Sequence, residues 1–240
     1  MRPEPVPDEA ALIAGSSLIV ADLHIGIEAE FRQRGFHIPD LTGGLAMRLM
    51  RLADAARARR LVILGDLKHG ITGQRADLGE LRWFLSELAE HLPVHIIKGN
   101  HDGAIQYLAR GIEGMTVHGP RGYKLGTIGL FHGHAHPSEE LMGSRTLVTA
   151  HEHPVVRLTD RLGTPVHMKV WLKVPLERGI GPKELIVMPA FNDFLGGTAV
   201  NSAETRFLGP FLRKKGALKL EDSEIYLLDG TYLGMRKDLI

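Results

Sequence analysis

The chain has 240 residues, 44% hydrophobic and 24% charged, which can bury one sizeable core and favours a single domain over residues 1–240. Its 29 basic and 28 acidic residues give a formal net charge of +1, which excludes a strong overall attraction to DNA or an anionic membrane and leaves only a local basic groove open. The absence of cysteine excludes disulfides and thiolate metal sites, so His, Asp and Asn are the candidate metal ligands.

The N-terminal sequence, Met1-Arg2-Pro3-Glu4-Pro5, lacks the apolar segment of a secretory signal. No stretch approaches the ~18 consecutive apolar residues that a membrane helix requires. We therefore expect a cytoplasmic protein whose partners do not include a membrane.

Three short apolar runs in the first hundred residues, at 18–20, 61–64 and 94–97, predict buried strands. Between them, residues 41–58 and 78–91 carry apolar side chains at helical spacing and predict two helices. The alternation of strand and helix indicates a βαβ arrangement. From residue 115 onward short β-like runs take over, and we expect a second sheet stacked on the first. These runs lie at 127–130, 146–149, 155–158, 166–174, 185–188 and 224–228.

Five short segments contain residues able to bind metal ions: Asp22-Leu23-His24, Gly65-Asp66, Gly99-Asn100-His101-Asp102, Phe131-His132-Gly133-His134 and Ala150-His151-Glu152-His153. The first three directly follow the three predicted strands, where open α/β sheets gather their ligands. Asp22 and His24 are alternate residues, so they point the same way if the strand geometry continues. Gly65 allows a sharp turn before Asp66. Asn100 offers a hard cation an amide oxygen without adding negative charge.

These segments, in this order, resemble the metal-binding motifs of the calcineurin-like metallophosphoesterases. The resemblance implies a four-layer α/β-β/α sandwich of two stacked mixed sheets flanked by helices. It implies a phosphoesterase that hydrolyses phosphate esters by attack of a metal-bound hydroxide. It also implies two divalent metal ions, for which oxygen and imidazole ligands favour Mn²⁺, with Fe, Zn or Ni suited to the same ligands.

The resemblance further assigns a role to each polar residue. Asp66 would bridge the two cations. At the first cation, the remaining ligands would be Asp22, His24 and His153. At the second cation, they would be Asn100, His132 and His151. His101 would protonate or stabilise the leaving group, so the expected catalytic residues are His101 and Asp66.

Three further residues are candidates for contact with the substrate or with the ligands. His134 could orient a ligand or reach the substrate. His69 stands where the family often has Asp or Cys, and we expect it near the metals. Arg32 could clamp a phosphate, because a guanidinium matches phosphate oxygens bidentately, although an exposed arginine at a helix end has the same pattern. Ala150 replaces the usual Gly of the last motif, so the turn there could differ.

Two alternatives were weighed against this interpretation. The metallo-β-lactamase-like hydrolases also use alternating histidines, but they need Asp-His after the second His, where this chain has Ala135-His136-Pro137. The other alternative is a non-catalytic scaffold or binding partner in a DNA-repair assembly that keeps the fold. Loss of Asp66, Asn100 or His101 would favour a scaffold, and all three are present.

Within the family, the chain looks like the archaeal phosphoesterases related to the SbcD nuclease subunit and like those found beside bacterial DNA-repair ligases. The similar segments are Phe31-Arg32 with Gly35 and Pro39, and residues 188–192 through Gly196-Gly197. This branch implies a phosphodiesterase or nuclease whose partner is a nucleotide or nucleic-acid phosphodiester. We expect no separate DNA-capping domain. Short single strands, cyclic nucleotides and other diesters stay open as substrates.

Overall fold

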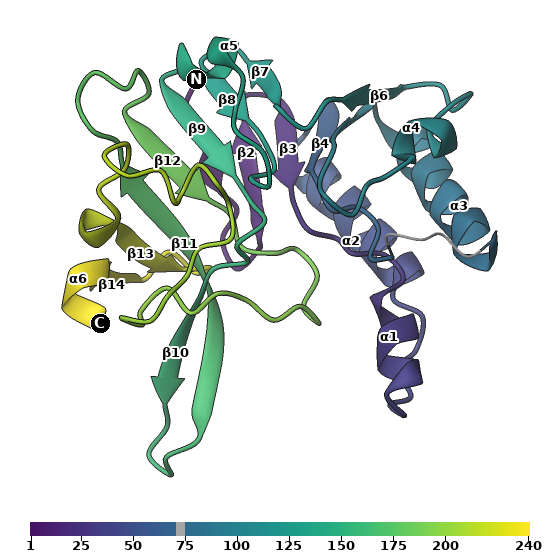
Figure 1. Ribbon diagram of the computed structural model, residues 1–240. Coiled ribbons are helices and arrows are strands. Elements are labelled where there is room, and N and C mark those ends of the chain that lie inside the picture. Colours follow the sequence, from purple (N-terminus) through teal and green to yellow (C-terminus); the bar gives the residue numbers. More distant parts are fainter. Residues whose placement is uncertain (71–74) are drawn as a thin grey trace.

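The computed structural model describes residues 1–70 and 75–240 and contains two stacked sheets (Figure 1). The first sheet has six strands in the order β1-β2-β3-β4-β5-β6. The strands β1 to β3 pair antiparallel and β3 to β6 pair parallel. Their bounds are β1 Glu4–Pro5, β2 Ala11–Ala14, β3 Ser17–Val20, β4 Arg60–Leu64, β5 Val94–Ile97 and β6 Met115–His118.

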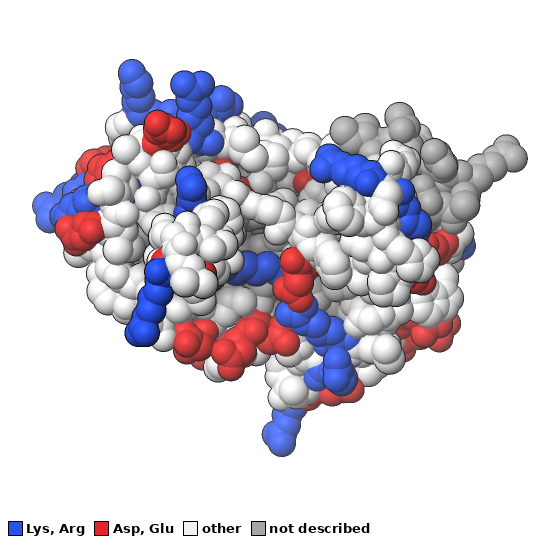
Figure 2. Space-filling view, turned by 90° about the horizontal axis from the view of Figure 1, so that it is seen from below, with Lys and Arg blue, Asp and Glu red and all other residues white. Residues whose placement is uncertain are grey.

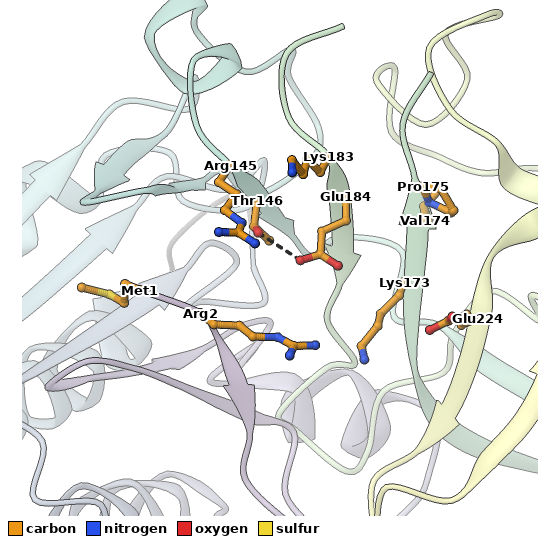
Figure 3. Close-up of a pocket in the computed structure, with 10 residues that line it drawn as sticks. All are labelled: Met1, Arg2, Arg145, Thr146, Lys173, Val174, Pro175, Lys183, Glu184 and Glu224. Carbon is orange, nitrogen blue, oxygen red and sulfur yellow. Dashed lines mark hydrogen bonds between the residues drawn. The ribbon is translucent and has the colours of Figure 1, made fainter. Parts of the chain in front are cut away.

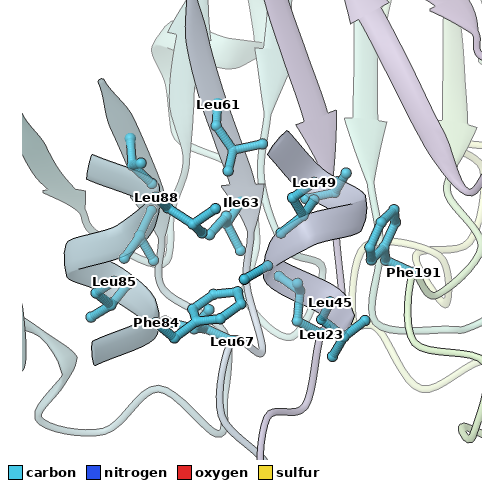
Figure 4. Packing of buried hydrophobic residues seen from close by; sticks show 14 of the residues in the cluster. Leu23, Leu45, Leu49, Leu61, Ile63, Leu67, Phe84, Leu85, Leu88 and Phe191 are labelled. Atoms are coloured by element: carbon cyan, nitrogen blue, oxygen red, sulfur yellow. The ribbon is translucent and has the colours of Figure 1, made fainter. Parts of the chain in front are cut away.

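The outer face of the first sheet is covered by two long helices, α2 (Thr42–Ala55) and α3 (Arg75–His91). Leu45, Leu49 and Ala53 recur every fourth residue along α2 and are all buried. They meet Phe84 and the neighbouring leucines of α3 over the side chains of β4 (Figure 4). Two shorter helices, α1 (Ile27–Gln33) and α4 (Ile105–Leu108), follow β3 and β5.

The second sheet has eight strands in the order β14-β13-β11-β12-β9-β8-β7, with β10 paired to β11. Strands β8, β9 and β12 are parallel, and β10 with β11 forms a long antiparallel hairpin that projects from the body (Figure 1). The bounds are β7 Tyr123–Leu125, β8 Ile128–Leu130, β9 Thr146–Thr149, β10 Val155–Thr159, β11 Pro165–Pro175, β12 Glu184–Val187, β13 Glu224–Leu227 and β14 Tyr232–Met235. Three short helices accompany this sheet: α5 Glu139–Met142, α6 Arg236–Leu239 and the 3-10 turn η1 Leu220–Asp222.

Three apolar clusters define the layers. One lies between α2, α3 and the first sheet, and a second lies between the sheets, where Ile19 and Val62 face Val148 and Trp171. The third covers the outer face of the second sheet, where Phe211 packs edge-on against Phe131. Three buried interfaces separate four layers. The predicted fold, two mixed sheets with flanking helices, is confirmed.

The differences from the sequence predictions lie at edges and ends. The helix predicted over 41–58 ends at Ala55, because Arg57 adopts a left-handed φ of 50°. Strand β6 was not among the predicted runs, and it extends the first sheet beside β5. As an edge strand it is only partly buried, so its sequence lacks a strong apolar run. The hairpin of β1 and β2 was not predicted. Among the described helices, none has both the length and the hydropathy to cross a membrane.

Candidate metal centre

Each of the five polar segments begins just beyond the carboxyl end of a strand. The segments with Asp22, Asp66 and Asn100 follow β3, β4 and β5 of the first sheet, and those with His132 and His151 follow β8 and β9 of the second. The strands within each set are parallel, so their carboxyl ends share one edge of the sheet. Stacking of the sheets brings the two edges together and places their ligand atoms within 4.8 Å of one another in overlapping groups.

The backbone turns sharply at most of these residues. Left-handed φ angles occur at five of the seven predicted ligands, between 43° and 72°: Asp22, His24, Asp66, His151 and His153. Side-chain-bearing residues adopt this conformation rarely and at a cost of about 1–3 kcal/mol each, and such residues cluster at functional sites. The expectation that Asp22 and His24 converge by continuing the strand geometry is wrong. Strand β3 ends at Val20, and left-handed turns direct both side chains.

Two glycines leave room for the ligands. At Gly65 a Cβ atom would lie 2.3 Å from Nδ1 of His132, and at Gly99 it would lie 2.1 Å from Oδ1 of Asp66. Both distances are far below van der Waals contact, so any larger residue would displace a ligand. Gly65 also has a φ of 83°, which glycine adopts without strain. Glycine therefore precedes Asp66 and Asn100 because a side chain at either position would collide with a predicted ligand.

The first group of ligand atoms belongs to Asp22, His24 and His153. Oδ1 of Asp22 lies 3.3 Å from Nε2 of His153. Nδ1 of His153 lies 3.1 Å from the carbonyl oxygen of Gly196, which places the ring proton on Nδ1 and the lone pair on Nε2. Oδ1 of Asp22 and Nε2 of both histidines are buried without a hydrogen bond. Such atoms are costly to leave unpaired, and their convergence is typical of a cation site.

The second group consists of Asp66, Asn100, His132 and His151. Nδ1 of His132 donates to the carbonyl oxygen of Leu64 at 2.9 Å, so its Nε2 presents a lone pair once a cation replaces the proton on that atom. That Nε2 lies 3.3 Å from both Oδ2 of Asp66 and Oδ1 of Asn100. Three electron-donating atoms thus face one another, and His151 completes a group within 4.8 Å with Asp66 and His132. A cation would satisfy all of these atoms.

Asp66 lies between the two groups. Its Oδ1 accepts the backbone N–H of His101 at 2.9 Å, which fixes the orientation of the carboxylate. Its Oδ2 lies 3.5 Å from Nε2 of His24 and 3.3 Å from Nε2 of His132. This oxygen therefore faces one ligand of each group, as a bridging carboxylate would need to.

His101 is held at the rim of the cluster. Its Nδ1 donates to the carbonyl oxygen of His69 at 2.5 Å, and its Nε2 lies 4.0 Å from Oδ2 of Asp66. The side chain is 24% exposed, whereas that of Asp66 is 3% exposed. A substrate oxygen could therefore reach Nε2 from solvent. The same atom also lies within 4.8 Å of ligand atoms of His24 and Asp66, so the geometry permits metal contact as well.

His24 is oriented by a chain of two further residues. Its Nδ1 lies 3.1 Å from Nδ1 of His69, and Nε2 of His69 lies 2.7 Å from Oε2 of Glu30. Because the carboxylate can only accept, Nε2 of His69 donates to Glu30, its Nδ1 accepts from His24, and the lone pair of His24 falls on Nε2. The chain from Glu30 therefore selects the tautomer that turns Nε2 of His24 toward the cluster. The prediction that His69 lies near the ligands agrees with this geometry.

Comparison with known proteins identifies the family. A family model described as calcineurin-like phosphoesterase matches residues 16–188. The chain belongs to this family. The match does not select the branch related to SbcD. No curated protein matches the chain.

Two solved structures are similar to this phosphoesterase. The nuclease MPE of Pseudomonas putida is 23% identical, with a TM-score of 0.61, over 95% of this chain and 98% of that one. A conserved uncharacterized protein of Streptococcus pneumoniae TIGR4, described as a predicted phosphoesterase, is 12% identical, with a TM-score of 0.32, over 75% of each chain. The first likeness supports the fold of the whole chain.

Two buried carboxylates, Asp102 and Glu152, connect the loops that carry the predicted ligands of this phosphoesterase. The motifs by themselves assign them no role. Asp102 accepts the N–H of Gly99 at 2.8 Å and of Leu67 at 2.9 Å, and so joins the loops after β4 and β5. Glu152, between two ligand histidines, accepts the N–H groups of Leu208 and Gly209. Burial raises the pKa of both carboxyl groups. Both residues lie inside the predicted metal motifs, and this position was the signal in the sequence. Most of their hydrogen-bond partners are distant along the chain, so no local pattern predicts these bonds.

His134 and Arg32, two of the three further candidates, differ in their distance from the predicted ligands. The ring of His134 lies 5.3 Å from that of His132 and 6.2 Å from that of His151, and its buried Nδ1 has no hydrogen bond. Arg32 is exposed on α1, and no contact among the described residues joins it to the ligands. The Ala150 position needs no glycine, because its φ is not left-handed and its N–H donates to the carbonyl oxygen of His132 at 2.8 Å.

The electrostatics of the cluster favour a cation. Burial raises the pKa of Asp22 and Asp66, but the neighbouring imidazoles outweigh it and hold both carboxyl groups below their ordinary pKa. Burial lowers the pKa of His132, but its hydrogen bond with Asp66 reverses the effect and raises the pKa to about 9. Burial lowers the pKa of His151 to about 4. The cluster thus contains two ionised carboxylates and a proton that a cation can replace.

A second cavity, of about 570 Å³, lies at the opposite ends of the strands of the second sheet (Figure 3). It is lined by the first residues of β9 and β12, Thr146 and Glu184, which share a hydrogen bond of 3.0 Å. Its charged lining combines four cations with two carboxylates: Arg2, Arg145, Lys173, Lys183, Glu184 and Glu224. The metal ligands are at the other ends of these strands, so this cavity is separate from the candidate centre.

Proposed function

We propose that this phosphoesterase is a dinuclear metal-dependent phosphodiesterase, of the nuclease kind, that acts on nucleotide or nucleic-acid phosphodiesters in the cytoplasm. The observation that carries the proposal is the convergence of two ligand groups on Oδ2 of Asp66. Buried, unpaired ligand atoms at Asp22, His24 and His153 add to it. A protein that used the fold only as a scaffold would have no need to retain such costly atoms.

The residues of the centre fit two divalent cations. Asp22, His24 and His153 would hold one, Asn100, His132 and His151 the other, and Asp66 would contact both. Oxygen and imidazole donors without thiolate suit Mn²⁺, our preferred metal, and also Fe, Zn and Ni. Two such cations, when bound, polarise a phosphate group and lower the pKa of a water molecule.

His101 is the proposed proton donor to the departing oxygen. Its Nδ1 is committed to the carbonyl oxygen of His69, so a protonated ring would carry its transferable proton on Nε2. The His101 side chain is 24% exposed, so a leaving group could approach that atom from solvent. A positioned acid of this kind typically contributes about 10²–10⁴-fold to the rate.

Two features support a diester over a monoester. The structural neighbour with similar length is a nuclease, and its fold covers 95% of this chain. The segments around Phe31 and residues 188–197 resemble the phosphoesterases related to SbcD and those beside DNA-repair ligases. We further propose that residues 1–240 act as one catalytic domain.

A metal-by-substrate screen tests the proposal. Metal-stripped protein is reconstituted with Mn²⁺, Fe²⁺, Zn²⁺, Ni²⁺ or Mg²⁺ and assayed on bis-p-nitrophenyl phosphate, p-nitrophenyl phosphate and a single-stranded oligonucleotide. We expect diester hydrolysis only with metal, and slower monoester hydrolysis. Substantial diester turnover in a metal-free sample, verified by elemental analysis, would overturn the proposal.

A matched pair of variants assigns the activity to the centre. Asp66→Asn removes the shared charge and should lower both metal content and rate by orders of magnitude. Asp54→Asn makes the same chemical change on an exposed face of α2 and should leave both unchanged. His132→Ala and His151→Ala should lose metal as well as rate. If both histidine variants hydrolysed diesters normally, the ligand assignment would be wrong.

A further inference from the structure

Three phenylalanines form an exposed aromatic group beside the metal centre. Phe31 lies on α1, Phe36 follows that helix, and Phe194 lies in the loop after β12. The ring of Phe31 contacts the other two edge to face, with centroid distances of 6.4 Å to Phe36 and 6.1 Å to Phe194. Phe36 is 62% exposed and Phe194 is 43% exposed. Exposed apolar side chains that cluster, rather than scatter singly, mark interaction sites.

The loop that carries Phe194 is fastened to the metal ligands on both sides. Before it, Asn192 donates through Nδ2 to the carbonyl oxygen of Leu23, between Asp22 and His24, at 2.8 Å. The N–H of Phe194 donates to Oδ1 of the same Asn192 at 2.9 Å. After it, the carbonyl oxygen of Gly196 accepts Nδ1 of His153 at 3.1 Å. Phe194 therefore has a fixed position relative to the candidate cations.

The helix that carries Phe31 is fastened to the same centre. Glu30, the preceding residue, contacts His69, which in turn contacts His24. The N–H of Phe36 donates to the carbonyl oxygen of Phe31 at 3.0 Å, which folds Phe36 back beside the helix. The three rings thus belong to two segments that both contact ligands, and together we call them the aromatic platform.

Basic and acidic side chains are mixed on this side of the molecule. Helix α1 and the hairpin of β10 and β11 project from the end at which β3 and β9 finish (Figure 1). In the view of that end, the described Lys and Arg side chains are interspersed with Asp and Glu, and they form no continuous basic tract across its middle (Figure 2). The net charge of +1 agrees with this distribution. A strand bound here would need contacts in addition to those that scattered cations provide.

We propose that the aromatic platform stacks unpaired nucleobases of a single-stranded nucleic acid whose phosphodiester lies at the metal centre. The inference rests on the proposed phosphodiesterase function and names its substrate class. Bases present flat π faces to aromatic side chains, and each stacked base contributes on the order of 10-fold in affinity with little sequence preference. Paired bases hide these faces in the duplex, so the platform selects single strands.

Binding measured without cleavage tests the platform directly. Fluorescence anisotropy in EDTA compares a labelled single-stranded 12-mer, a duplex of that sequence, and an abasic strand of equal length and charge. We expect the wild-type protein to bind the base-bearing strand about 10-fold more tightly than the other two. The Phe36→Leu and Phe194→Leu double variant should bind all three alike. Trp83→Leu, which removes an exposed aromatic ring from α3, should behave as wild type.

The outcomes separate this inference from the proposed function. Equal or undetectable binding of base-bearing and abasic strands by the wild-type protein would overturn the platform, whatever the hydrolytic activity. Unchanged preference in the double variant would overturn it as well. With Mn²⁺, the double variant should raise KM for the base-bearing strand about 10-fold and leave kcat and the hydrolysis of abasic strands unchanged. Preferred binding without any metal-dependent hydrolysis would support the platform and reject the phosphodiesterase.

Discussion

The side chains around Asp66 differ in the chemistry that they can perform, because one of their two polar atoms is already hydrogen-bonded. His132 and His153 each use one ring nitrogen in a hydrogen bond with a backbone carbonyl oxygen, and the other ring nitrogen faces the carboxylates. His101 does the same with the carbonyl of His69, but it is more exposed than the buried His132. Exposure therefore separates His101 from the buried His132.

The first prediction concerns this difference. His101→Asn should keep metal occupancy near normal and lose about 10²–10⁴-fold in rate on nucleotide esters, whose leaving oxygen needs a proton. It should lose much less on a nitrophenyl ester, whose leaving group departs unprotonated. Rates on both substrates, measured on one preparation of known metal content, decide the point. His136→Asn, the same change at an exposed histidine, is the control. An equal loss on both esters, or loss of metal, would make His101 a ligand or an orienting residue.

The second prediction concerns the chain from Glu30 through His69 to His24. Glu30→Ala removes the acceptor that sets the tautomer of His69, so the affinity of the first cation should fall by up to about 10-fold. The effect belongs at the low end of the usual range, because the Glu30 side chain is 42% exposed and water partly replaces it. Competition with a chelator measures the metal dissociation constant. Arg34→Ala breaks the other ion pair of Glu30 and should leave that constant unchanged. Equal affinities in wild type and Glu30→Ala would contradict the chain.

At the scale of elements, the centre is assembled by turns rather than by strands. Each strand leads the chain toward the centre and ends before its predicted ligand. A residue with a left-handed φ, or a glycine, then changes the direction of the backbone. Asp102 ties the loop after β4 to the loop after β5, and Glu152 ties the loop after β9 to residues 208–209. The strain at the ligands is thus maintained by hydrogen bonds between loops.

The third prediction tests this tight packing of loops. Gly99→Ala would place a methyl group 2.1 Å from Oδ1 of Asp66, so the loop must move and the carboxylate with it. We expect a loss of about 1–3 kcal/mol in the free energy of unfolding and reduced metal content. Thermal unfolding and elemental analysis measure both. Gly103→Ala, four residues later, meets nothing within 4 Å and should be neutral. A Gly99→Ala protein with normal Tm and normal metal content would show that the loops are not tightly constrained.

At the scale of the whole molecule, the ligands come from two sheets whose shared interface is apolar. Asp22, Asp66 and Asn100 follow strands of the first sheet, and His132 and His151 follow strands of the second. Cations held by both sets would connect the sheets at their carboxyl edge. Without them, the ionised Asp22 and Asp66 repel each other, since the charge of Asp66 raises the pKa of Asp22.

The fourth prediction follows from this connection. Metal at 100 times its dissociation constant should stabilise the folded state by about 2.7 kcal/mol. For a chain of this size that corresponds to a rise in Tm of about 5–10 °C relative to the protein in EDTA. Differential scanning calorimetry with and without Mn²⁺ measures the shift. Asp66→Asn should reduce it, since it weakens both sites. A Tm that does not respond to metal in the wild-type protein would show that no cation joins the sheets.

The sequence by itself determined the fold class and the family resemblance, and it supplied the predicted ligands. Apolar runs of three or four residues and helical spacing are local patterns, so β3, β4, β5, α2 and α3 were predicted close to their observed bounds. The metal motifs are local as well, because each places its polar residues within a few positions of a strand end. The structure brings six of the seven predicted ligands, together with His101, into overlapping groups, and their role as ligands stays a prediction.

Only the tertiary structure decided which distant residues meet. The hydrogen bond between Asn192 and Leu23 spans 169 positions, and that between Glu152 and Gly209 spans 57. Neither periodicity nor a motif encodes such a pairing, because it depends on how two sheets and their loops stack. The same holds for the edge strand β6, whose weak apolar pattern reflects half-burial, and for the aromatic platform. Its rings come from α1 and from a loop after β12, and only packing against the shared ligands makes them neighbours.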